Sequence, residues 1–210
     1  MKRRAVILLA IAGVVLAGGW WFARPGRVRN SPPPPGPIVA FGDSLTAGTG
    51  APRGTSYPDE LARLIGRPVL NLGVPGETIA DAARRVDDQL LALRPGIVIV
   101  LLGGNDVLRR QNLDESFDEL ERLVRRVQEA GAMVVVVGLR GVTPVGGLGA
   151  RYRRLARQTQ ALYVPNILGG VFSKRELMAD GVHPNAAGYR VIAQRIADAL
   201  RPHLGDFNEP

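Results

Sequence analysis

The sequence lacks several features on which common protein functions depend. It contains no cysteine, which excludes a disulfide framework, a thiol nucleophile and a thiolate metal site. The glycine-rich stretch 138–149 fits neither the spacing of a dinucleotide-binding turn nor that of a phosphate-binding P-loop. We therefore expect no cofactor and no metal ion.

Acidic residues are also absent from the first part of the chain, up to Asp43. The whole chain carries a net charge of +8, but six basic residues precede this first acid. The remainder holds 21 basic and 19 acidic residues, a net charge of +2. Nucleic-acid binding needs a concentrated basic surface, so we expect no nucleic-acid partner.

The N-terminal segment 1–23 is predicted to be a signal anchor. Residues 5–23 carry no charge, and a helix of that length spans about 28 Å, close to the hydrocarbon core of a bilayer. A cleaved signal peptide, cut after the small residues 17–19, is the alternative. Basic residues flank both ends of the stretch, but the first flank also carries the amino terminus, which favours a cytoplasmic N-terminus. The rest of the chain is then expected on the periplasmic or extracytoplasmic side, anchored or released.

A proline-rich linker is predicted at 24–37, where six prolines favour an extended, semi-rigid spacer. The domain is predicted at 38–204, with a tail at 205–210. Within the domain, apolar runs alternate with amphipathic helical stretches. Strands are expected at 38–41, 69–72, 97–102, 133–137 and 163–164. Helices are expected at 57–65, 77–93, 116–130, 151–162 and from Asn185 to about 200. This alternation predicts an α/β fold with a central parallel sheet and helices on both faces.

Polar turns that contain glycine follow the first three strands, at 42–44, 71–77 and 103–106. Active sites of such folds lie at the carboxyl ends of the strands, so these turns are expected to converge on one rim. Each turn taken alone could instead be an ordinary strand end or helix cap.

Three residues offer the parts of a nucleophilic site. A serine hydroxyl is a weak nucleophile until a base takes its proton, and Ser44 lies in the first turn. Of the two histidines, His183 has an acid, Asp180, three residues before it. Thr46 stands where a Gly-x-Ser-x-Gly elbow needs glycine, which disfavours the α/β-hydrolase fold.

Four blocks of the sequence, taken in order, resemble the SGNH or GDSL-type hydrolases. They are Gly-Asp-Ser-Leu-Thr at 42–46, Asn-Leu-Gly-Val-Pro-Gly-Glu-Thr at 71–78, Gly-Gly-Asn-Asp at 103–106 and Asp-Gly-Val-His-Pro at 180–184. The stretches 101–109 and 178–185 are most similar to the branch of bacterial thioesterase I, an arylesterase and lysophospholipase. The resemblance implies a three-layer, flavodoxin-like α/β/α domain.

The resemblance also implies roles for single residues. Ser44 would be the nucleophile, His183 the base and Asp180 the group that orients the base. The Ser44 and Gly73 backbone N–H groups and the Asn105 amide would form the oxyanion hole. Asp43 and Asp106 are expected to be structural, and His203 incidental. An acyl pocket is expected to include Leu45, Leu108, Gly146, Gly147, Leu177 and Met178.

The resulting prediction is a serine esterase that forms an acyl-enzyme. Its partner would be a small-molecule or lipid acyl ester, such as an aryl or short-chain ester, a lysophospholipid or an acyl thioester. The alternatives are a carbohydrate O-acetylesterase acting on envelope polysaccharide and a non-catalytic domain that binds acyl chains or glycans. The intact set of catalytic residue types disfavours the non-catalytic alternative.

Overall fold

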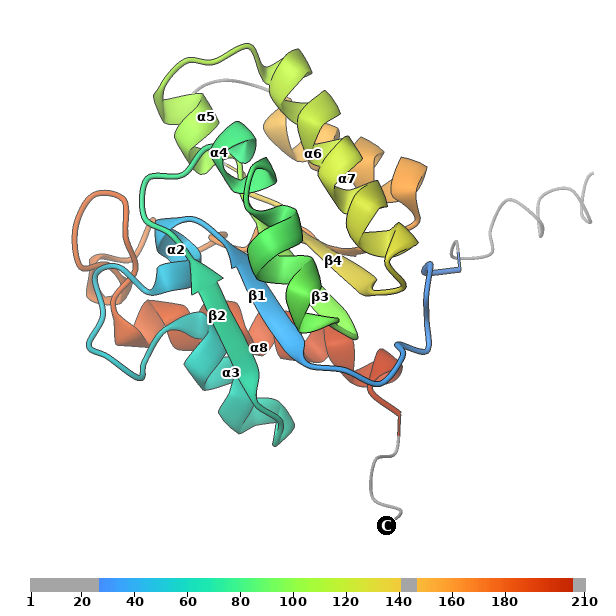
Figure 1. Ribbon diagram of the computed structural model, residues 1–210. Helices are drawn as coiled ribbons and strands as arrows, with labels where there is room; N and C mark the ends of the chain where they lie inside the picture. Colours follow the sequence, from blue (N-terminus) through green and yellow to red (C-terminus); the bar gives the residue numbers. More distant parts are fainter. Residues whose placement is uncertain (1–26, 141–146, 206–210) are drawn as a thin grey trace, which may run out of the picture.

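The computed structural model describes residues 27–140 and 147–205, which form a five-stranded parallel sheet with flanking helices (Figure 1). The spatial strand order is β2-β1-β3-β4-β5, the order of flavodoxin-like folds. The predicted three-layer α/β/α architecture is therefore confirmed. The strands are β1 (Ile38–Gly42), β2 (Val69–Gly73), β3 (Ile97–Leu101), β4 (Met133–Val137) and β5 (Leu162–Val164).

Helices cover both faces of the sheet. On one face α3 (Tyr57–Ile65) packs against α8 (Ala186–Leu200), and on the other α6 (Leu113–Glu129) lies between α4 (Ile79–Ala83) and α7 (Leu148–Thr159) (Figure 1). Two short helices, α2 (Ser44–Ala47) and α5 (Gly104–Leu108), follow β1 and β3. Single 3₁₀ turns, η3 (Arg175–Leu177) and η4 (Arg201–His203), flank α8.

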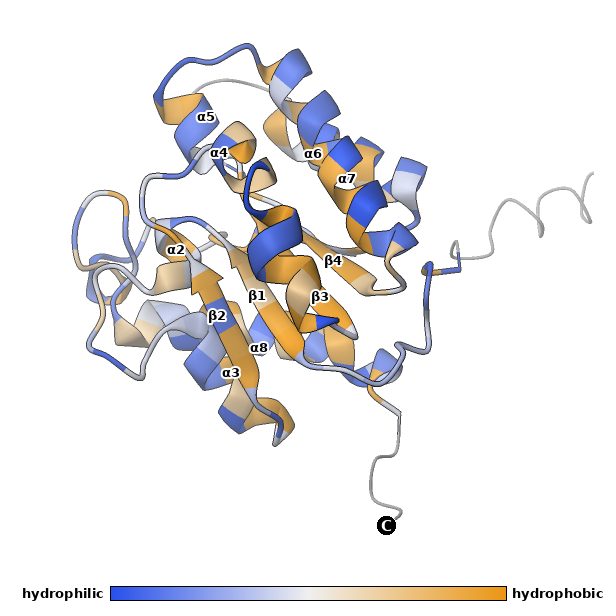
Figure 2. Ribbon diagram, viewed as in Figure 1, coloured by the Kyte–Doolittle hydropathy of each residue, from blue (hydrophilic) through white to orange (hydrophobic). Residues whose placement is uncertain are grey.

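The three central strands consist of buried residues, which explains their unbroken apolar sequences. Every residue of β1, β3 and β4 is buried, whereas the edge strand β2 is half-exposed. In Figure 2 the strands are predominantly hydrophobic, and hydrophilic residues mark the outer sides of the helices. Burial of apolar side chains on both faces of the sheet supplies the main driving force for this arrangement.

The prediction of a single helix at 77–93 is wrong. The chain forms α4, then a π-helical turn, η1 (Val86–Leu90), and a 3₁₀ turn, η2 (Leu91–Leu93). Leu93, expected on the buried face, is 37% exposed. The break coincides with Arg85, whose buried guanidinium donates to the Leu72 carbonyl (2.9 Å) instead of pointing outward.

Part of the predicted linker is docked on the domain. The Arg29 N–H donates to the Gln160 carbonyl (2.9 Å). The Asn30 amide donates to the carbonyls of Gln128 (2.8 Å) and Ala132 (2.9 Å). His203, expected to be incidental, has its Nδ1 2.8 Å from the Ser31 hydroxyl and so contacts the same segment.

The predicted anchor at 1–23 lies outside the described residues. Among the residues that are described, none of the helices combines the length and the apolar character needed to cross a bilayer. The anchor therefore remains a prediction from the sequence.

The docked segment yields a first prediction. Asn30 has a positive φ of 58°, which glycine tolerates, so Asn30→Gly removes the two amide hydrogen bonds without backbone strain. We expect the variant to lose about 1–3 kcal/mol of unfolding free energy in urea denaturation. Arg27→Gly at an exposed position controls for the added glycine. Equal losses in the two variants would show that the contacts of Asn30 contribute nothing.

Candidate active site

The polar turns meet at one rim because three strands end at the same level. Gly42, the last residue of β1, pairs with Gly73 in β2 and Leu101 in β3. Asp43 then caps α2, its carboxylate accepting a hydrogen bond from the Leu45 N–H (3.0 Å). Ser44 is the first residue of that helix and is half-buried at the rim.

Ser44, His183 and Asp180 form one chain of hydrogen bonds. His183 Nε2 lies 3.1 Å from Ser44 Oγ, and Nδ1 lies 2.9 Å from Asp180 Oδ2. The second oxygen of Asp180 accepts from the N–H groups of Val182 and His183, both at 2.7 Å. Hydrogen bonds from the His183 side chain and from these two N–H groups lower the pKa of Asp180 to about 2.

An ionised Asp180 can only accept, so Nδ1 of His183 carries the hydrogen and Nε2 is free to accept from Ser44. A serine whose proton can pass to an oriented histidine is an activated nucleophile. The geometry therefore brings together the three residues for which the sequence predicts the roles of nucleophile, base and orienting acid.

Leu177 and Met178, expected in the pocket wall, support the loop that carries His183 instead. Met178 forms an antiparallel bridge with Pro184, and the Leu177 carbonyl accepts from the Asn185 N–H (2.9 Å). Asn185 in turn caps α8. These backbone contacts tie the loop to the start of a long helix and hold His183 toward Ser44.

A cavity of about 300 Å³ opens beside Ser44 and His183, and apolar atoms make up most of its wall. Leu45 and Leu108, expected substrate contacts, lie in this wall; Gly147 is exposed and not in the wall, and Gly146 lies outside the described residues. The lining residues are Asp43, Ser44, Leu45, Thr49, Pro75, Gly76, Gly104, Asn105, Leu108, Leu139, Leu168, Phe172, Val182 and His183.

Four of the six apolar lining residues were not assigned to the pocket from the sequence: Leu139, Leu168, Phe172 and Val182. Leu139 follows β4, so the rule that sites lie at the carboxyl ends of strands would have found it. Leu168 and Phe172 lie in an irregular segment before η3, where no periodic pattern gives a signal.

Gly73, the expected oxyanion donor, does not line the cavity. Its N–H donates to the Asn71 side-chain oxygen (2.9 Å), and a Cβ added to it would lie 2.1 Å from the Ala47 nitrogen. Gly73 therefore serves the close packing of β2 against α2. Gly76, three residues later, lines the cavity in its place.

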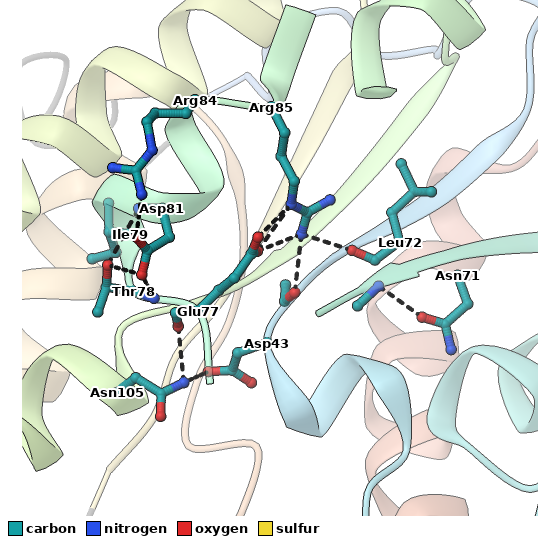
Figure 3. Close-up of polar contacts among 12 residues, drawn as sticks. Asp43, Asn71, Leu72, Glu77, Thr78, Ile79, Asp81, Arg84, Arg85 and Asn105 are labelled. Atoms are coloured by element: carbon teal, nitrogen blue, oxygen red, sulfur yellow. Dashed lines mark hydrogen bonds and ion pairs between the residues drawn. The ribbon is translucent and has the colours of Figure 1, made fainter. Parts of the chain in front are cut away.

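Asn105, in α5, lies beside the cavity as expected. Its Nδ2 donates to the Glu77 carbonyl (2.8 Å) and lies 3.5 Å from Asp43 Oδ2 (Figure 3). The first contact fixes the amide plane, and the second amide hydrogen has only a long contact within the described residues.

Asp43 and Asp106 are both buried and have the structural contacts expected of them. The Asp106 carboxylate accepts from the Ile79 N–H (3.1 Å) at the start of α4. Burial is the main cause that raises the pKa of Asp43 to about 6.

Comparison with known proteins identifies the family of the chain. The sequence model of the GDSL-like lipase/acylhydrolase family matches residues 40–191. The chain belongs to this family. The chain is therefore an enzyme, an ester hydrolase of the GDSL type.

Two relatives and one solved structure illustrate the likeness. The arylesterase of Vibrio mimicus is 30% identical over 80% of this chain and 89% of its own length. The thioesterase 1/protease 1/lysophospholipase L1 of Escherichia coli K12 is 28% identical over 79% of this chain and 83% of its own length. The crystal structure of TesA superposes with a TM-score of 0.75 at 26% identity, covering 80% of this chain and 99% of TesA.

The buried Asp43 of this GDSL hydrolase predicts a pH-dependent stability. Its pKa is higher in the folded than in the unfolded state, so the folded protein holds a proton that the unfolded chain releases between pH 3.8 and about 6. The contribution of Asp43 to the free energy of unfolding therefore falls as the pH rises from 3.8 to about 6, by at most about 3 kcal/mol. Asp43→Asn removes the effect.

Urea unfolding of wild type and Asp43→Asn from pH 4 to 7.5 measures this difference. We expect the free energy of unfolding of Asp43→Asn, minus that of wild type, to increase as the pH rises from 4 to about 6. A constant difference would contradict the raised pKa of Asp43.

Proposed function

We propose that the protein is a serine esterase that cleaves acyl esters through an acyl-enzyme. The observation that carries this proposal is the hydrogen-bonded chain Asp180–His183–Ser44 opening onto an apolar cavity. Ser44 Oγ attacks the ester carbonyl while its proton passes to His183 Nε2. The imidazolium then gives that proton to the leaving oxygen, which leaves the acyl group on Ser44. Water, activated by His183, releases the acid.

The tetrahedral intermediate needs hydrogen-bond donors at its oxyanion. We assign them to the Ser44 N–H, the Gly76 N–H and the Asn105 amide hydrogen that makes only the 3.5 Å contact with Asp43. All three residues border the cavity. Gly76 replaces Gly73 in this assignment, because the N–H of Gly73 is already bound to Asn71.

The cavity wall favours acyl groups as substrates. Six apolar side chains, those of Leu45, Leu108, Leu139, Leu168, Phe172 and Val182, surround the space beside Ser44. Recognition of a sugar would require fixed polar groups for its hydroxyls, and the polar lining residues are mostly those used in catalysis. We therefore favour aryl or short-chain esters, lysophospholipids and acyl thioesters over acetylated polysaccharide. The similarity to an arylesterase and to a thioesterase/lysophospholipase supports this choice.

We further propose, from the sequence of residues 1–23, that this activity lies on the extracytoplasmic side of the membrane. The apolar stretch between Arg4 and Arg24 supports the proposal.

The nucleophile is tested with a fluorophosphonate probe on wild type and Ser44→Ala. We expect stoichiometric labelling of wild type and none of the variant, because the phosphonate traps the activated serine. Equal labelling of the variant, or no labelling of wild type, would refute the assignment. A series of p-nitrophenyl esters of increasing chain length, run beside acetylated xylan, then distinguishes acyl esters from sugar acetates.

The oxyanion hole is tested with Asn105→Ala. Removal of one donor should lower kcat for p-nitrophenyl butyrate about 100- to 1,000-fold and change KM little, since the oxyanion exists only in the transition state. The exposed Asn112→Ala, at the cap of α6, is the matched control and should leave kcat unchanged. A loss confined to KM would assign Asn105 to ground-state binding instead.

A further inference from the structure

A buried ion pair lies directly behind the catalytic rim. Arg85 Nε donates to both carboxylate oxygens of Glu77, at 2.8 and 2.9 Å, and Nη2 donates to Oε2 at 2.6 Å (Figure 3). The two side chains are only 10% and 13% exposed. Neither residue lines the cavity or has a role in the mechanism proposed above.

Arg85 also joins the ends of two strands. Its Nη2 donates to the carbonyls of Leu72 (2.9 Å) and Gly42 (3.3 Å), the residues at the ends of β2 and β1. The guanidinium carbon lies 4.2 Å from the centre of the Phe41 ring, over its face. One side chain thus contacts the points where the loops of Ser44 and Gly76 begin.

Glu77 connects the ion pair to the oxyanion donors. Its carbonyl accepts the amide hydrogen of Asn105 at 2.8 Å, and it directly follows Gly76. The Gly76 carbonyl is held from the other side by Arg109 Nη2 at 2.7 Å. The Glu77 backbone therefore links two proposed oxyanion donors, and its side chain is fixed by Arg85.

Stability alone is a poor explanation for this pair. Desolvation of two charges is costly, and apolar residues of similar volume often stabilise a protein as well or better. Arg85 Nη1 is buried with no hydrogen-bond partner in the described part of the chain. The helix predicted at 77–93 is also interrupted where Arg85 turns inward.

We propose that Arg85 and Glu77 are positioning residues for the oxyanion hole. Arg85 fixes Glu77, the Glu77 carbonyl orients the Asn105 amide, and the same anchorage presents Gly76 to the cavity. The inference rests on the proposed esterase function and adds to it two residues that do not touch substrate.

The test uses the full chain and p-nitrophenyl butyrate, with Arg85→Gln, Arg85→Lys, Asn105→Ala and the double variant Arg85→Gln/Asn105→Ala. Arg85→Gln should lower kcat about 10- to 100-fold and change KM by less than about threefold, because the oxyanion forms only in the transition state. Arg85→Lys keeps the charge but loses the bidentate geometry of the guanidinium, so its kcat should lie between that of Arg85→Gln and that of wild type. Arg84→Gln, at the exposed neighbouring position, should stay within about twofold of wild type.

The double variant separates positioning from a general structural effect. If Arg85 acts in part through Asn105, Arg85→Gln should lower kcat less in the Asn105→Ala background than in the wild-type background, and the remaining loss is the part that passes through Gly76. Losses that multiply in the double variant would overturn the proposal. So would an Arg85→Gln enzyme as active as the Arg84→Gln control.

A further double variant controls for loss of stability as the cause of a lower kcat. Arg85→Met/Glu77→Met replaces both charges by apolar side chains and should fold with a melting temperature close to that of wild type. We expect it to be as impaired in kcat as Arg85→Gln. Recovery of full kcat together with stability would show that the ion pair serves folding only, and would overturn the proposal.

Fluorophosphonate labelling distinguishes failure of the esterase proposal from failure of the positioning role of Arg85. If wild type is neither labelled nor active, the esterase proposal fails and this inference fails with it. If wild type is labelled at Ser44 but the Arg85 variants match the control, only the positioning role is wrong.

Discussion

The shared level at which β1, β2 and β3 end is the constraint on which the active site depends. Gly42 pairs with both Gly73 and Leu101, so the loops that carry Ser44, Gly76 and Asn105 leave the sheet side by side. The strands keep this register along their whole length, and every residue of β1 and β3 is buried. Only His183 and Asp180 arrive from elsewhere, on a loop held by the start of α8. The sheet and the Asn185 cap of α8 therefore position the residues of the site.

The carboxylates of Asp180, Asp43 and Glu77 differ in their interactions because their environments differ. Asp180 is 55% exposed and receives hydrogen bonds from His183, which keep its pKa near 2 and the group ionised. Asp43 is buried beside the nucleophile, and its pKa is raised to about 6. Glu77 is nearly buried but is matched by Arg85. In the proposed mechanism, Asp180 orients the base and Glu77 anchors the segment that holds Gly76, whereas Asp43 caps α2, although all three have the same functional group.

The parts of the fold that follow from local pattern could be predicted from the sequence. The strands β1, β3 and β4 are continuous apolar runs, α3 has the predicted bounds, and Asn185 caps α8. The break at Arg85 could not be predicted, because it depends on Glu77 and on carbonyls of other strands. Sequence spacing also could not tell Gly73 from Gly76, since the two glycines are three residues apart and only the folded backbone decides which one lines the cavity. The docking of Asn30 depends on carbonyls about 100 residues away.

We propose that Ser44, Gly76 and Asn105 together bind the tetrahedral intermediate. A crystal structure of the protein inhibited by an alkyl phosphonate tests it most directly, because the adduct reproduces the geometry of that intermediate. We expect phosphorus bonded to Ser44 Oγ and one phosphonyl oxygen within hydrogen-bond distance of the Gly76 nitrogen and Asn105 Nδ2. The alkyl chain should lie in the cavity lined by Leu139 and Phe172. An oxygen directed to solvent or to Gly73, or phosphorus bonded to another residue, would refute the proposed oxyanion site.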